Sequence, residues 1–334
     1  MKVLVTVPFS ASSASREMLG LPEEWERLHN WWSDKFISHP ETTPPPPVKN
    51  RKFENIPILD SYEKIPPTEF WANFPSMDVP KFITSFIDVE YLEKELEIVS
   101  HLLTASEIVR AKKCIDYLKN GASSCVKKDL DSCFVKNSKQ AFIHGKEVTD
   151  SIADWISKGF VAGPFEKPPM DKFRVNSILA IPQPGKVRIC LNVSLPEKDS
   201  LNDHTDKSKL EKIRMTSAKK FSFSILECGK GCLMWKFDFE NAYKQVPIPT
   251  SEYPLQGFFW LGKFFVELKQ IFGSVASVQN FDIVGNSIKT ICHATCKIPK
   301  RLVHRQLDDT PFVSPSNKQW GSEFAERYKS LCKN

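Results

Sequence analysis

Proline is concentrated in the first quarter of the chain, and this limits where a packed core can form. Pro44 to Pro47 form an uninterrupted run, and further prolines follow up to Pro80. Because proline fixes φ and has no backbone N–H to donate, such a stretch is a poor source of hydrogen-bonded interior. We therefore expect residues 1–80 to form a proline-rich, poorly structured N-terminal region, and the core to come from the remainder of the 334 residues.

Helical patterns follow this region. Asp88 precedes apolar residues spaced three and four apart, which is the periodicity of one helix face. Thr104 and Glu107 form a capping-box signature ahead of a second apolar stripe, and Gly121 marks its end. The range 81–148 is therefore predicted to be a helical segment.

The pattern changes after Gly159, where a third helix that starts at Thr149 or Asp150 is expected to end. Strand-like runs are expected at residues 160–161, 177–181, 187–193 and 233–239, a hairpin at 258–266 and a helix at 275–292. This mixture predicts an α+β fold.

Composition excludes some classes of protein. Hydrophobic residues make up 41% and charged residues 26%, which is usual for a globular chain. No apolar run approaches the roughly 18 residues that a membrane span needs, so we expect no membrane partner. The nine Cys form no dense disulfide pattern, which favours an intracellular location, cytoplasmic or nuclear.

Charge is unevenly placed along the chain. Residues 1–150 carry 19 Lys and Arg against 22 Asp and Glu, so the remainder carries 27 against 18. A basic C-terminal half suits a polyanionic partner such as a phosphate backbone, and the alternative is a solvated surface with no partner.

Three acidic residues stand at the ends of apolar segments. Asp238 ends one apolar run, and Asp308 and Asp309 are flanked by another. A carboxylate beside a buried strand is costly unless it is paired, hydrogen-bonded or bound to a metal. Two Mg²⁺ ions about 4 Å apart can hold the attacking and leaving oxygens of a phosphoryl transfer. The acids are therefore a candidate metal site, although an acid of this kind taken alone is more often a solvated turn residue.

The residues around these acids resemble motifs of reverse transcriptases. Residues 237–247 (FDFENAYKQVP) are similar to the first catalytic motif, and residues 306–309 (QLDD) to the later Asp-Asp hairpin. The resemblance implies that Asp238, Asp308 and Asp309 are catalytic and bind two Mg²⁺ or Mn²⁺ ions.

Two further segments extend the resemblance. Residues 182–192 (PQPGKVRICLN), followed by SLND at 200–203, are similar to the fingers hairpin, and residues 272–277 (FGSVAS) to the turn that supports template and nucleotide. In that hairpin an Arg holds the incoming triphosphate, and a planar guanidinium suits phosphate oxygens. The implied nucleotide-binding residues are Arg188, Lys186, Tyr243, Phe272 and Gly273, where Tyr243 would exclude ribonucleotides and Gly273 would let template and nucleotide approach the backbone.

Within this superfamily the chain is most similar to DIRS-like, tyrosine-recombinase retrotransposons, on residues 163–165 (GPF) and the hairpin with SLND. It departs from the general pattern at Gln183, where a Lys is usual, and at Gln306, where an aromatic residue is more familiar. Only 25 residues follow Asp309 (334 − 309). We therefore expect residues 149–334 to hold truncated fingers and palm, without a thumb or RNase H.

The fold implied is α+β, a polymerase fingers and palm sheet with helices on one face, preceded by the helical segment and the proline-rich region. The function implied is that of a retroelement RNA-directed DNA polymerase, with an RNA or DNA template–primer and dNTP as partners. The alternative is a catalytically inactive, basic nucleic-acid-binding remnant of the palm.

Two other groups of residues invite interpretation. Cys292, Cys296 and His304 could hold zinc, but buried Cys often serves only as a small apolar residue, and core packing is favoured. The aromatic hairpin at 258–265 could stack on bases, and core packing is again favoured.

Overall fold

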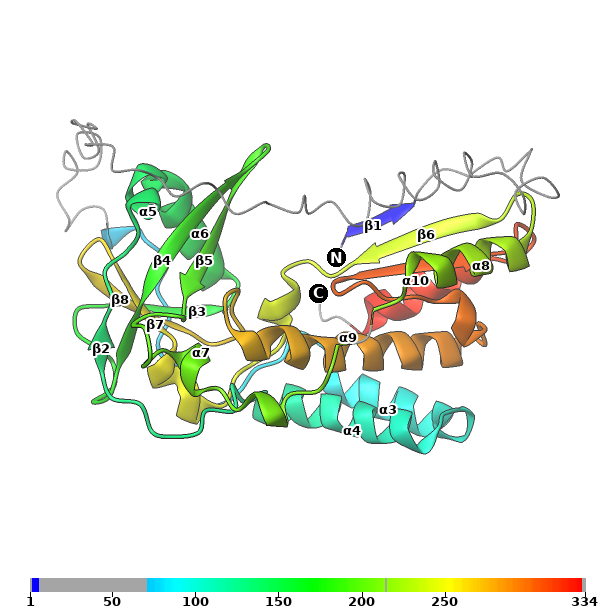
Figure 1. Ribbon diagram of the computed structural model, residues 1–334, viewed down its shortest axis with the longest axis horizontal. Helices are drawn as coiled ribbons and strands as arrows, with labels where there is room; N and C mark the ends of the chain where they lie inside the picture. Colours follow the sequence, from blue (N-terminus) through cyan, green and yellow to red (C-terminus); the bar gives the residue numbers. More distant parts are fainter. Residues whose placement is uncertain (1, 6–70, 214, 332–334) are drawn as a thin grey trace. The chain divides into compact units, whose positions relative to one another are not determined.

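The computed structural model describes residues 2–5, 71–213 and 215–331. The chain divides into two compact units (Figure 1). The first comprises residues 1–57, 214–240 and 292–329, and the second comprises residues 58–213, 241–291 and 330–334. The prediction made for residues 1–80 lies outside the described residues, except at positions 2–5 and 71–80.

An antiparallel three-stranded sheet is the framework of the first unit. Its strand order is β1 (Lys2–Val5), β6 (Leu233–Asp238) and β9 (Asp309–Ser314). The helices of this unit are α8 (Ala218–Cys228), α10 (Trp320–Ser330) and the 3₁₀ helix η5 (Lys300–Leu302).

Helices α8 and α10 pack on opposite faces of this sheet. Met234 and Val313 are buried with Phe221 of α8. Phe237, at the other parity of β6, contacts Phe324 of α10 with 5.0 Å between ring centroids. Because successive side chains of a strand point to opposite faces, the apolar residues of β6 pack against both helices.

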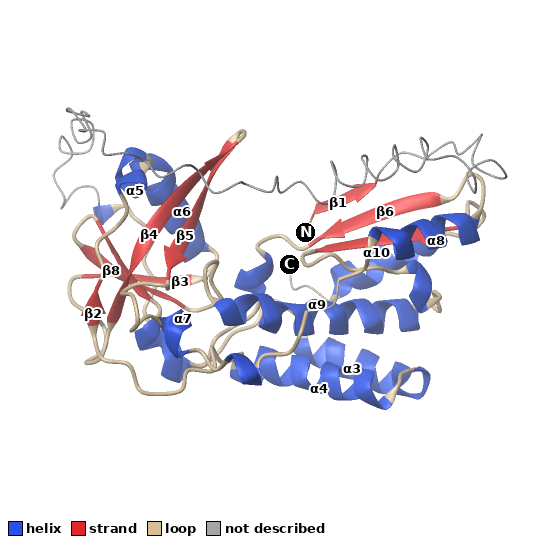
Figure 2. Ribbon diagram, in the orientation of Figure 1, coloured by secondary structure: helices blue, strands red, loops and turns tan. Residues whose placement is uncertain are grey.

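The second unit contains a mixed six-stranded sheet (Figure 2). Its order is β2 (Cys133–Phe134), β4 (Arg174–Gln183), β7 (Gly257–Trp260), β8 (Lys263–Glu267) and β3 (Val161–Phe165), and β5 (Lys186–Asn192) pairs with β4. Strands β4 and β5 form a long hairpin whose tip extends beyond the neighbouring strands. The pairings β2–β4 and β4–β7 are parallel, whereas the others are antiparallel.

The longer helices of this unit begin where the sequence predicts. Helix α3 (Val89–Val99) is capped by Asp88, whose carboxylate accepts from the Tyr91 N–H at 3.0 Å. Helix α4 (Ala105–Asn120) begins with the Thr104–Glu107 capping box and ends at Gly121, which has a φ of 82°. The remaining helices are η1 (Ser100–Leu102), α5 (Lys139–Ile143), α6 (Gly145–Ser157), α7 (Leu201–His204), η2 (Lys207–Lys209), η3 (Ala242–Gln245), η4 (Thr250–Leu255) and α9 (Val275–Thr295), the last continuing into the first unit.

Helix α6 corrects one boundary, because it begins at Gly145 rather than at Thr149 or Asp150. Thr149 is buried inside the helix, where its hydroxyl donates to the Gly145 carbonyl at 2.7 Å. The same hydroxyl accepts from the Trp260 indole N–H at 2.9 Å. Thr149 therefore satisfies a core tryptophan instead of capping the helix.

The structure confirms the α+β class. Strands β3 to β8 and helix α9 overlap the ranges expected from periodicity, with differences at their ends, whereas no strand was expected at β9. Among the described helices, none combines the length and apolar character that a membrane crossing requires.

Candidate active site

The carboxylate corner, defined as Asp238, Asp308 and Asp309, lies at the ends of β6 and β9. Asp238 is the last residue of β6 and Asp309 the first of β9, and the register pairs them directly. Residues opposite each other on antiparallel strands have Cα atoms about 5 Å apart. The Asp308 carbonyl accepts from the Phe239 N–H at 3.3 Å, which ties the third acid to the same corner. The sheet thus brings together three acids that the sequence separates by 70 residues (308 − 238).

A tight turn presents the two adjacent acids. The Gln306 and Asp309 backbones exchange hydrogen bonds of 2.8 and 2.9 Å, with Leu307 and Asp308 at the tip. Leu307 has a φ of 53°, which is unfavourable for a residue with a branched side chain by roughly 1–2 kcal/mol. Flanking hydrogen bonds must hold such a conformation, and backbone strain of this kind is often found at functional sites.

Charge at the corner is unbalanced. Burial is the main reason that the pKa of Asp309 is raised from 3.8 to about 6. The Asp308 and Asp238 carboxylates raise this pKa further, whereas Lys236, with its Nζ 2.9 Å from the Asp309 carboxylate, lowers it. One ammonium therefore offsets only part of the repulsion among three carboxylates.

The donor set suits a hard cation. Carboxylate oxygens are the ligands that Mg²⁺ prefers, and a cation would relieve the repulsion that raises the pKa of Asp309. Within residues 2–5, 71–213 and 215–331, no three His, Cys, Asp or Glu side chains already converge in a metal-binding arrangement. Asp309 is instead paired with Lys236, whose Nζ lies 2.9 Å from its carboxylate.

The nucleotide cluster, defined as Arg188, Tyr243 and Phe272, lies in the second unit. The Arg188 guanidinium stands over the Phe272 ring at 5.2 Å from its centroid. Tyr243, on η3, meets the same ring edge-on at 4.6 Å and packs against Phe281 at 5.7 Å. Three of the five residues predicted to bind nucleotide are thus in one continuous set of contacts.

The other two predicted residues lie beside this cluster. Lys186 is exposed at the tip of the β4–β5 hairpin, and alternation places it on the same face of β5 as Arg188. Gly273 follows Phe272 with a φ of 105°, and a Cβ there would stand 2.4 Å from the Leu191 carbonyl oxygen. Only glycine lets the turn after Phe272 lie this close to β5, so packing alone explains the residue type.

Sequence reasoning missed two lysines. Lys236 precedes Asp238 by two positions in an otherwise apolar strand. Because side chains two positions apart point to the same face, this spacing could have predicted that Lys236 lies near the acids. Lys244 is buried beside Tyr243, hydrogen-bonded to Glu267, and 4.3 Å from the Trp155 ring centroid. Burial lowers the pKa of Lys244 and raises that of Glu267. No local pattern linked these two charges.

The alternative groups of residues have structural partners. His304 Nε2 is 2.7 Å from the Ser224 hydroxyl, and its ring packs edge-on against Phe221. In the aromatic hairpin, Phe258 and Phe265 are fully buried and stacked at 5.1 Å, as expected for core packing.

Comparison with known proteins gives a distant likeness at the level of structure. No protein-family model matches the chain, and no curated protein matches it. The chain is similar to the native prototype foamy virus protease–reverse transcriptase, with 14% identity and a TM-score of 0.46 over 76% of this chain and 33% of that one.

Two complexes of foamy viral protease–reverse transcriptase give similar values. The complex with an RNA/DNA hybrid has 15% identity and a TM-score of 0.45, over 76% of this chain and 33% of that one. A form in complex with double-stranded DNA has 15% identity and a TM-score of 0.43, over 76% and 43%. The chain therefore spans less than half the length of these three proteins, and at such scores their activity is not transferred to it.

Proposed function

We propose that this chain is the polymerase part of a retroelement RNA-directed DNA polymerase of the DIRS-like kind. Its substrates would be dNTP and an RNA or DNA template–primer, inside the cell. The observation that carries the proposal is the register of β6 and β9, which pairs Asp238 with Asp309 beside Asp308. These acids stand within the two sequence motifs that resemble reverse transcriptases.

The corner and the nucleotide cluster would have separate tasks. Asp238, Asp308 and Asp309 would hold two Mg²⁺ or Mn²⁺ ions, which when bound supply positive charge for the attacking and leaving oxygens. Arg188 would bind triphosphate oxygens through its planar guanidinium. The Phe272 ring beneath Arg188 would limit its orientation, and the Tyr243 ring would block a ribose 2′-OH.

A second candidate is a nucleic-acid-binding module without catalytic activity. The ion pair between Lys236 and Asp309 favours it, because the ammonium already neutralises an acid that would otherwise bind metal. The basic C-terminal half of the sequence would provide the binding surface.

Primer extension separates the two candidates. The assay uses a poly(rA)/oligo(dT) template–primer with Mg²⁺ or Mn²⁺ and compares the native chain with Asp238→Asn. Asp116→Asn is the matched control, because Asp116 is exposed on α4, where it accepts a hydrogen bond from the neighbouring Asn120. We expect extension by the native chain and the control, and a loss of about 100-fold or more in Asp238→Asn. Extension that survives in Asp238→Asn, or is absent in a folded native chain, contradicts polymerase activity at this corner.

A further inference from the structure

The short motif at residues 200–203 (SLND) forms a locally fixed turn. The Asp203 N–H donates to the Ser200 hydroxyl at 3.1 Å, and the Ser200 N–H donates to the Asp203 carboxylate at 3.2 Å. This reciprocal capping box opens helix α7. The turn fixes the backbone of Asn202, one of the two residues between Ser200 and Asp203, and leaves its side chain to form hydrogen bonds outside the motif.

The Asn202 amide holds both sides of the turn that follows Phe272. Its Nδ2 donates to the Gly273 carbonyl at 2.7 Å, and its Oδ1 accepts from the Val275 N–H at 2.9 Å. Val275 is the first residue of α9, so this N–H has no carbonyl partner within its own helix. Asn202 therefore caps α9 from a segment more than 70 residues earlier in the chain (275 − 202 = 73).

The same turn determines where the Phe272 ring lies. Gly273 packs so closely on β5 that a Cβ would meet the Leu191 carbonyl at 2.4 Å. The ring one residue earlier contacts both Arg188 and Tyr243. A shift of the turn away from β5 would therefore separate the three members of the nucleotide cluster.

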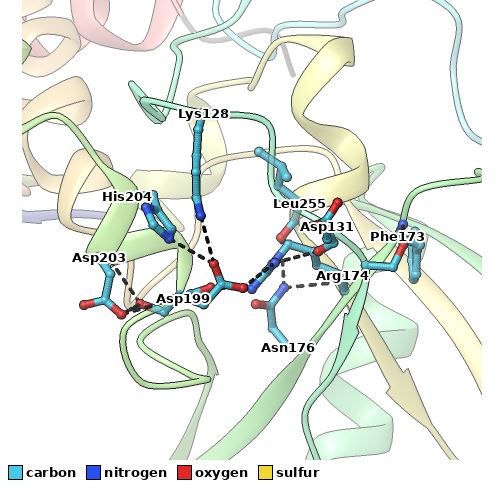
Figure 3. A network of polar contacts seen from close by, with 11 residues as sticks. Lys128, Asp131, Phe173, Arg174, Asn176, Asp199, Asp203, His204 and Leu255 are labelled. Atoms are coloured by element: carbon cyan, nitrogen blue, oxygen red, sulfur yellow. Dashed lines mark hydrogen bonds and ion pairs between the residues drawn. The ribbon is translucent and has the colours of Figure 1, made fainter.

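A buried arginine fixes the other end of this arrangement (Figure 3). Arg174, at the start of β4, is 1% exposed and donates to the Asp199 and Asp131 carbonyls, both at 2.6 Å. The Asp199 carboxylate lies 3.0 Å from His204 Nε2, and it also faces Lys128 and Arg174. Arg174 thus attaches Asp199, just before the motif, to the sheet, and His204, just after the motif, contacts the same Asp199.

We propose that Asn202 is a positioning residue for nucleotide binding, through its hold on the Gly273–Val275 turn. This inference rests on the proposed function for its effect on catalysis, but its structural part can be measured without activity. Asn202 itself contacts none of the three members of the nucleotide cluster in the hydrogen bonds described. Its effect would reach them only through the turn.

The test compares Asn202→Ala, Asn202→Asp and the control Asn120→Ala. Asn120 is an exposed asparagine at the end of α4 whose amide donates to Asp116 on the same helix. The Asp variant keeps the acceptor for the Val275 N–H but loses the donor to the Gly273 carbonyl and to the Ser194 hydroxyl, so its effect should be smaller than that of Asn202→Ala. Hydrogen exchange over residues 272–276 and steady-state kinetics for dNTP are measured on all four proteins.

In Asn202→Ala we expect exchange in 272–276 to accelerate about tenfold, as a cap is lost. We expect KM for dNTP to rise about tenfold with kcat within about twofold of native, because the chemistry-bearing acids are untouched. Exchange and KM equal to those of Asn120→Ala would overturn the inference. If Asn202→Ala exchanges faster but none of the four proteins incorporates dNTP, the role of Asn202 in the turn is supported. The proposed polymerase activity would then be contradicted.

Discussion

One neighbour of the Asp309 carboxylate favours its ionised form, whereas its burial and two nearby acids disfavour it. That neighbour is Lys236, which lies 2.9 Å away. The result is a carboxyl whose pKa of about 6 is close to neutral pH. A divalent cation at the corner would have to displace the proton or the ammonium, so cation affinity should fall below this pH.

Asp309→Asn should change how stability depends on pH. The folded-state pKa is raised, so the contribution of Asp309 is fully present below pH 3.8 and is lost as pH rises through about 6. With allowance for partial solvent screening, the loss is about 1–2 kcal/mol. Urea unfolding at pH 4 and pH 7 should therefore show a steeper decline for the native protein than for Asp309→Asn. Equal declines in the two proteins would contradict the assigned shift.

Helix α10 packs against the three-stranded sheet at Gly321, where there is no room for a side chain. A Cβ on Gly321 would stand 1.9 Å from the Trp235 ring. That ring is fixed, because its indole N–H donates to the Ser314 hydroxyl at 3.2 Å. The glycine therefore determines how closely the helix approaches the face of β6 opposite the corner.

Gly321→Ala should destabilise the protein by about 2–3 kcal/mol, because overpacking forces either the ring or the helix to move. Ser322→Ala, one residue further along the same helix and exposed, should be nearly neutral. Thermal and urea unfolding of the two variants provide the comparison. A stable Gly321→Ala variant would mean that Trp235 has another position available at little cost.

At the scale of the whole molecule, charge should control association with nucleic acid. Residues 151–334 carry 27 basic against 18 acidic side chains. If this excess neutralises about three phosphates, affinity should fall more than tenfold between 50 and 200 mM salt. Fluorescence anisotropy with a labelled single-stranded RNA measures this directly. Affinity that does not depend on salt would exclude a phosphate-backbone partner for this half of the chain.

Local features of the fold were predictable from sequence, whereas distant contacts were not. Asp88 and Thr104 cap helices within three residues of themselves, so their roles follow from spacing alone. The start of α6 was placed too late, because Thr149 resembles a capping residue. Its hydroxyl instead accepts a hydrogen bond from Trp260 inside the helix. The hold of Asn202 on Gly273 joins residues 71 positions apart, and no periodicity links them. The three acids were noticed because apolar runs flank them, and the resemblance of their neighbours to known motifs gave them a role.

Strand register makes the carboxylate corner vulnerable to one kind of genetic change in particular. The side chains of a strand alternate between its faces, so removal of a single codon inside β9 would turn Asp309 away from Asp238. Every acid would still be encoded, and the reading frame would be intact. After such a deletion the motifs would still be recognisable in the sequence, although the three acids would no longer form one site. A test of activity in related copies should therefore compare the number of residues within β6 and β9 as well as the residues themselves.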